Sequence, residues 1–180
     1  MALVVRLATE QDIPSLTHLI PESVRALSVG YYTDRQIESA LVHIFGVDSQ
    51  LIADGTYYVV VADDQIVGCG GWSKRKTLYG GDQMKGDADD LLDPAHDAAR
   101  IRAFFVHPNW TRRGIGRSII EACEAAACQE GFRSMELGAT LPGEPLYAAM
   151  GYTVTERFAI AMPDGESLPA AHMVKVLKCG

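Results

Sequence analysis

The segment spanning residues 100–117 limits what this chain can fold into more than any other part of it. Residues 101–106 form a strand-like run that passes a turn at Pro108 and reaches Gly114-Ile115-Gly116, where a helical pattern begins. The segment contains five arginines and no acidic residue, although the chain has a formal net charge of −7. A strand that enters a helix through a glycine-containing turn is typical of α/β proteins that bind phosphate groups.

Three of these arginines, Arg112, Arg113 and Arg117, surround the expected start of the helix. The helix macrodipole disfavours cations at that end, where aspartate or glutamate would be expected. Free backbone N–H groups and cations at the same turn indicate a receptor for a phosphorylated ligand.

The composition predicts one globular domain covering residues 1–180. The chain is 48% hydrophobic, and no linker rich in proline, glycine or serine divides it. Its start does not resemble a signal peptide, and its longest apolar runs are too short to span a membrane. The overall acidity argues against a general nucleic-acid binder. We therefore expect a cytoplasmic protein with neither membrane nor nucleic-acid partners.

The cysteines and histidines give no indication of a metal site. Cys123 and Cys128 are five residues apart, about 140° around a helix, so they can neither form a disulfide with each other nor share a metal. No Cys-x-x-Cys or His-x-x-x-His spacing occurs in the chain. We expect no bound metal.

The hydrophobic pattern predicts about seven strands and four helices. A capping box at Thr9 predicts a first helix that ends at Pro21, and a second capping box at Thr33 predicts the next helix. Two connections are expected to be irregular, a polar one at residues 46–55 and a longer one at residues 73–99. The remaining helices are expected at residues 114–130 and 144–150, and the strands at 3–7, 56–62, 65–72, 101–106, 134–138, 152–162 and 172–177.

These elements predict a mixed α/β fold. The strand, helix and strand around the basic turn imply parallel pairing, whereas the hairpin before them and the two closing strands imply antiparallel pairing. We expect a mixed, mostly antiparallel sheet with helices on both faces. The long connection at residues 73–99 either shapes a functional site or a subunit contact, or is a solvated hairpin tip.

Two common phosphate-binding loops do not match the basic turn. A P-loop requires Gly-Lys-Ser/Thr, which is missing here. A dinucleotide-binding fingerprint requires a small residue where Ile119 stands, and a turn that follows the strand without the intervening residues 107–113.

A third loop matches, and the chain resembles the GCN5-related N-acetyltransferase (GNAT) superfamily. Family members carry Val-x-Pro at a strand end, an aromatic residue, Gln/Arg-x-x-Gly-x-Gly/Ala opening a helix, and later Leu-Tyr-x-x-x-Gly-Phe. This chain has Val106-His-Pro108, Trp110, Thr111-Arg-Arg-Gly114-Ile-Gly116 and Leu146-Tyr147-Ala-Ala-Met-Gly151-Tyr152. Thr111 departs from the family preference for Gln or Arg, and Thr140 and Gly143 depart from the Asn-x-x-Ala that commonly precedes the tyrosine. The order of elements is also similar over nearly the whole chain.

The resemblance implies roles for individual residues. Backbone N–H groups of the basic turn would hold the CoA pyrophosphate, and the preceding strand would offer its backbone to the pantetheine arm. Tyr147 would be the general acid for the leaving thiolate. Glu136 is the candidate general base, and a water relay to a backbone carbonyl is the alternative. The implied CoA-binding residues are Phe104, Phe105, Val106, Thr111, Arg112, Arg113, Gly114, Ile115, Gly116 and Arg117.

The resulting hypothesis is an acetyl-CoA-dependent N-acetyltransferase that acts directly on an amine of a small molecule or of a peptide N-terminus. The alternative is a non-catalytic acyl-CoA sensor or regulatory module with the same fold, and a homodimer is compatible with either function. Arg100 and Arg102 would face an anionic acceptor or pair with acids of residues 87–97, with pairing favoured. Trp72 and Tyr79 could line the acceptor pocket.

Overall fold

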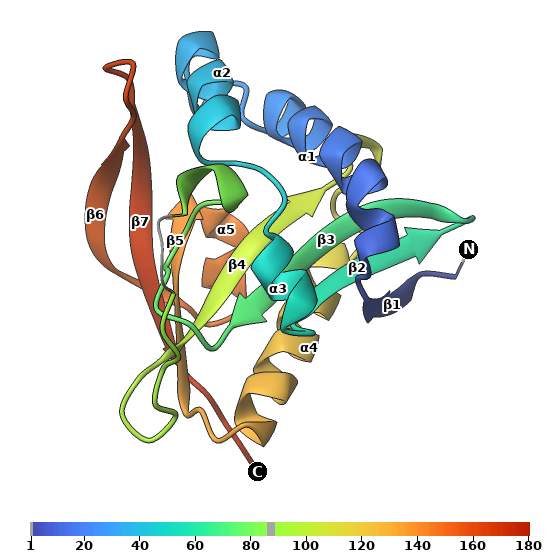
Figure 1. Cartoon of the computed structure of the whole chain (residues 1–180), viewed down its shortest axis with the longest axis vertical. Helices are drawn as coiled ribbons and strands as arrows, with labels where there is room; N and C mark the ends of the chain where they lie inside the picture. Colours follow the sequence, from blue (N-terminus) through green and yellow to red (C-terminus); the bar gives the residue numbers. More distant parts are fainter. Residues whose placement is uncertain (1, 86–88) are drawn as a thin grey trace.

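All seven strands of the protein lie in one mixed sheet (Figure 1). The computed structural model describes residues 2–85 and 89–180. The strand order is β1-β2-β3-β4-β5-β7-β6, and every neighbouring pair is antiparallel except β4 and β5. The strands are β1 (Val4–Leu7), β2 (Tyr57–Ala62), β3 (Gln65–Ser73), β4 (Ala99–Val106), β5 (Ser134–Thr140), β6 (Thr153–Ala161) and β7 (Ser167–Val176). This confirms the expected α/β class and the mostly antiparallel sheet.

Helices cover both faces of the sheet and create two apolar layers. The helices α1 (Ile13–Leu27), α2 (Asp34–His43) and α3 (Ser49–Ala53) pack on one face around Leu16, Ile20 and Leu51. The other face is covered by α4 (Ile115–Gln129) and α5 (Glu144–Ala149), around Ile119 and Phe132. Short 3-10 turns occur at Glu10–Asp12, Asp82–Met84 and Pro108–Trp110. None of the helices in the described part of the chain is both long and apolar enough to cross a membrane.

Helix α1 does not end at Pro21, so the predicted boundary is wrong. The helix continues to Leu27 and buries Ser23 and Val24 beyond the proline. Pro21 removes one N–H group from the helical ladder, yet the buried face repeats without interruption across it. Packing against the sheet therefore outweighs the local cost of the proline.

The connection at residues 46–55 is not wholly irregular, which adds a fifth helix to the four expected. Asp48 caps α3 by accepting hydrogen bonds from the N–H groups of Gln50 and Leu51, at 3.1 and 3.4 Å. Side-chain capping stabilises a short helix that propensity alone would not maintain. The turn between β2 and β3 follows expectation more closely, since Asp63 and Asp64 both adopt the positive φ that a two-residue hairpin requires.

A disulfide joins Cys128, near the end of α4, to Cys179 at the end of the chain, across 51 residues. Cys69 and Cys123 are free and buried. Disulfides are more usual in oxidising compartments, so the cysteines give no support to a cytoplasmic location.

Candidate active site

Strands β4 and β5 separate soon after they begin. Their parallel pairing covers only Ala99 with Met135 and Arg100 with Glu136. The β5-facing edge of residues 101–106 therefore has no strand partner among the described residues. A backbone edge inside a sheet is a place where an extended ligand can add hydrogen bonds.

A bulge in β4 marks the point of separation. Ala103 has φ of 55°, and β4 has an additional residue relative to β3 at this point. The hydroxyl of Tyr57, a buried residue of β2, donates to the carbonyl oxygen of Ala103 at 2.7 Å. Strain of this kind clusters at functional sites. No glycine stands at the bulge, so the sequence gives no signal for it.

The basic turn lies where β4 leads into α4. Arg112 and Gly114 have positive φ values of 59° and 80°, and α4 begins at Ile115 without a side-chain cap or an acidic residue in its first turn. Among the described residues, no backbone hydrogen bond outside the regular elements is donated by the N–H groups of residues 112–117. The guanidinium of Arg113 lies over the ring of Trp110, 4.6 Å from its centroid. The turn is thus a row of free backbone donors flanked by exposed cations, which is an anion-binding arrangement.

The two glycines of the turn have different structural roles. A Cβ atom at Gly114 would enter open space, so this residue is required for its backbone conformation. A Cβ atom at Gly116 would lie 2.6 Å from Cδ2 of Leu146. Gly116 therefore allows α4 to approach α5 closely, in addition to leaving its N–H group free.

Tyr147, on α5, lines a narrow cavity of about 80 Å³ at the separation of β4 and β5. It is only 8% exposed, and its ring packs edge-on against Phe104 and Tyr152. Burial raises the pKa of its phenol well above the ordinary value, so the hydroxyl stays protonated at neutral pH. None of the side-chain hydrogen bonds of the described residues involves this hydroxyl. Tyr147 is therefore a protonated phenol beside the cavity whose hydroxyl has no hydrogen-bond partner among the described residues.

Phe104 also lines this cavity, as does Phe105, whose ring packs edge-on against Phe45. Val106 and Thr111 lie between the cavity and the basic turn; Val106 packs on the α4 side, and Thr111 is exposed. Phe104, Phe105 and Tyr147 therefore meet at the cavity, whereas Glu136 does not line it.

Glu136 lies on the face of β5 that α1 and α2 cover, two residues before Gly138. One of its carboxylate oxygens accepts a hydrogen bond from Arg100, and the other contacts Nε2 of His172 at 3.2 Å. Both oxygens are therefore engaged, although each keeps a second lone pair that can accept a hydrogen bond.

Arg102 pairs with Asp48 rather than with an acid of residues 87–97, so the predicted partner is wrong. Its guanidinium donates to Oδ2 of Asp48 at 2.9 Å and to the carbonyl oxygens of Thr77 and Gly80. Asp48 also accepts from Lys85. Arg100 likewise pairs with Glu136, not with the acidic run. Of that run, Asp87 falls outside the described residues. Charge counting along the chain could not reveal these partners because they come from different segments.

The two aromatic residues expected at the acceptor pocket have different positions. Tyr79 lines the cavity and stacks on Phe158, with ring centroids 5.8 Å apart. Trp72 is wrong for this role, because it is buried on the opposite face of the sheet against Phe132. Alternation along β3 places it there. Four further residues line the cavity and have no recognisable signal in the sequence: Ile44, Phe45, Ile160 and Leu168.

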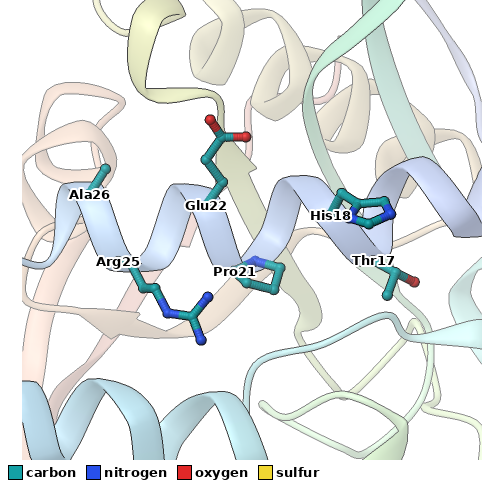
Figure 2. Close-up of a pocket in the computed structure, with 6 residues that line it drawn as sticks. All are labelled: Thr17, His18, Pro21, Glu22, Arg25 and Ala26. Carbon is teal, nitrogen blue, oxygen red and sulfur yellow. The ribbon is translucent and has the colours of Figure 1, made fainter.

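A wider hollow of about 630 Å³ lies along α1 and is lined by Thr17, His18, Pro21, Glu22, Arg25 and Ala26. In Figure 2 these side chains fan out around the helix rather than converge on one point. Arg25 is already paired with Glu38 of α2 at 2.8 Å. One of its lining residues, Glu22, contacts Nε2 of His107 at 3.4 Å, so the hollow adjoins the end of β4, but neither Tyr147 nor any residue of the basic turn lines it.

Comparison with known proteins identifies the family. The model of the acetyltransferase (GNAT) domain matches residues 53–154. The chain belongs to the GNAT acetyltransferase family. The match includes the basic turn and Tyr147, and no curated protein matches the chain.

Solved structures of GNAT proteins share the fold over almost the whole chain. A GCN5-related N-acetyltransferase from Rhodopseudomonas palustris is 21% identical, with a TM-score of 0.72 and coverage of 98% of this chain and 97% of that one. PaiA N-acetyltransferase from Thermoplasma acidophilum, in complex with coenzyme A, is 14% identical, with a TM-score of 0.65 and coverage of 98% and 99%. The ribosomal-protein-S18-alanine N-acetyltransferase from Escherichia coli is 12% identical, with a TM-score of 0.60 and coverage of 99% and 96%.

Proposed function

We propose that this GNAT protein is an acetyl-CoA-dependent N-acetyltransferase that acts on an amine of a small molecule or of a peptide N-terminus. The observation that carries the proposal is the row of free N–H groups at residues 112–117, flanked by three exposed arginines. Two proteins of similar fold agree with such an activity, the PaiA N-acetyltransferase in complex with coenzyme A and the ribosomal-protein-S18-alanine N-acetyltransferase.

The residues fit acetyl-CoA along one path. The N–H groups of Arg112 to Arg117 would bind the pyrophosphate, and the arginine side chains would neutralise its charge. The unpaired edge of Phe104, Phe105 and Val106 would bind the amide groups of the pantetheine arm, as an added strand does. Acetyl-CoA would supply the activated thioester at the cavity that Tyr147 lines.

Direct transfer then requires a positioned amine and two proton movements. Tyr147 would donate its phenolic proton to the sulfur as the carbon–sulfur bond breaks. Glu136 would take the proton from the amine, or a water would carry that proton to a backbone carbonyl. No metal is needed for either movement.

The test measures thiol release from acetyl-CoA with a panel of amines and identifies the acetylated atom by mass spectrometry. Tyr147→Phe keeps the ring packing and should lower turnover by roughly 10²–10⁴-fold. CoA affinity should change by no more than about five-fold, because one hydrogen bond contributes only ~1 kcal/mol. This pattern would mark an interaction made in the transition state.

Tyr152→Phe is the matched control, because Tyr152 packs beside Tyr147 and its hydroxyl contacts Glu124 at 3.5 Å instead of lining the cavity. Its turnover should stay near that of the unmodified protein. Equal turnover in Tyr147→Phe would remove the general-acid role, and CoA binding without thiol release for every amine would overturn the proposed function.

A further inference from the structure

The cavity beside Tyr147 has a second wall, on the face covered by α1 and α2, that the chemistry of acetyl-CoA does not explain. Its side chains are apolar or aromatic and come from three separate regions of the chain. They are Ile44 and Phe45 after α2, Tyr79 in the long connection, and Ile160 and Leu168 in the β6–β7 hairpin. Ile44, Ile160 and Leu168 are buried. This wall lies opposite Tyr147, where an acceptor has to approach.

The charged groups nearby are already paired. Arg102 is the only charged residue among the described residues that line the cavity. Its side chain is 1% exposed, and its guanidinium is held by Asp48, Thr77 and Gly80. An anionic acceptor group would have to compete with this buried ion pair.

No carboxylate lines the cavity within the described part of the chain, so a second cationic group on the acceptor would enter without a partner. Burying such a charge is costly. The neighbouring carboxylate of Glu136 is engaged by Arg100 and His172.

We infer that the acceptor is an amine that carries a small, uncharged, apolar group. This inference rests on the proposed function and names the substrate class of that site. The apolar group packs between Tyr79 and the β6–β7 hairpin, while the amine points toward the thioester. The volume of about 80 Å³ favours a short aliphatic group, since a cavity of about 150 Å³ is what holds a benzene ring.

The inference is tested with three amines of similar length, isopentylamine, 1,4-diaminobutane and 4-aminobutanoate, with saturating acetyl-CoA at one pH. Isopentylamine should give the highest kcat/KM, by about 10-fold or more, because the other two bring a charged tail into an apolar wall. A higher kcat/KM for the diamine or the amino acid overturns the inference while leaving the proposed function intact. Thiol release from none of the three, with CoA still bound, also overturns the inference, whereas the proposed function falls only if every amine of the wider panel fails.

Gly138→Ala probes the same wall without removing a contact. A Cβ atom there would lie 3.3 Å from Cδ1 of Tyr79 and 3.6 Å from Cζ of Phe158. KM for isopentylamine should rise several-fold, on the order of one methylene's effect in a pocket, whereas CoA affinity should not change. Gly180→Ala is the control, because a Cβ atom at the chain end meets nothing within 4 Å. An unchanged KM in folded Gly138→Ala counts against the proposed wall, and the comparison of amines does not depend on this variant.

Discussion

At the scale of single residues, the backbone conformation of the basic turn is set by positions that sequence reasoning recognises only in part. Gly114 is identified by its motif, and its φ of 80° explains why glycine is needed there. Arg112 has the same left-handed conformation without a glycine, and Ala103 forms the bulge of β4. Such non-glycine positions have no signature in the sequence because the surrounding structure imposes them.

Gly114→Ala should weaken CoA binding at least several-fold. The substitution forces a side chain into the left-handed region, at a cost of about 1 kcal/mol or more, and its Cβ would enter the open space beside the free N–H groups. Gly165→Ala is a matched control, because Gly165 has φ of 89° and equally open surroundings in the β6–β7 turn. Calorimetric titration with CoA should show reduced affinity for Gly114→Ala and unchanged affinity for Gly165→Ala. Equal affinity in the two variants would contradict a role for this turn in CoA binding.

At the scale of elements, regular patterns were predictable and long-range packing was not. The β2–β3 hairpin, both capping boxes and α4 follow from local signals in the sequence. The continuation of α1 past Pro21 follows from contacts with distant strands, and the early start of β7 at Ser167 from pairing with the end of β6 across the hairpin. The candidate site divides in the same way, since the turn and Tyr147 have motifs whereas the apolar wall is assembled from segments far apart in the sequence.

The long connection at residues 73–99 is tied to α3 by an ion pair that should depend on pH. Arg75 binds both oxygens of Asp54, at 2.7 and 2.9 Å, and this hydrogen bonding lowers the pKa of Asp54 below its ordinary value of 3.8. The pair therefore stabilises the protein above about pH 4, and this contribution is lost as pH falls through the lowered pKa. Asp54→Asn should reduce the free energy of unfolding by about 1–2 kcal/mol at pH 7.

Urea unfolding at pH 7 and near pH 3 tests this, and the difference between Asp54→Asn and the unmodified protein should shrink at the lower pH. Glu38→Gln is the control, because Glu38 and Arg25 form a similar two-point contact with side chains more than half exposed. Glu38→Gln should reduce the free energy of unfolding less than Asp54→Asn does, because solvent screens an exposed pair. Equal losses for the two variants would show that burial of the Asp54 pair adds nothing.

At the scale of the whole molecule, the Cys128–Cys179 disulfide fixes the end of the chain to α4. The chain-entropy model assigns a closed loop of this length about 4 kcal/mol, and measured effects are commonly about 2–4 kcal/mol. Cys179→Ser should lower the free energy of unfolding by about 2–4 kcal/mol. Dithiothreitol should destabilise the unmodified protein to the same level and leave Cys179→Ser unchanged; a variant as stable as the oxidised protein would contradict this account.

Because β4 and β5 share only two residue pairs, the sheet consists of two parts joined by a short stretch of strand pairing. One part contains β1 to β4 and the other contains β5 to β7. Beyond these two pairs, the two parts are held together by side-chain packing. Packing is less directional than a ladder of backbone hydrogen bonds and resists sliding of the strands less. A ligand whose amide groups lie between β4 and β5 would supply hydrogen bonds that the two strands do not make with each other. A ligand bound between β4 and β5 would therefore also stiffen the protein.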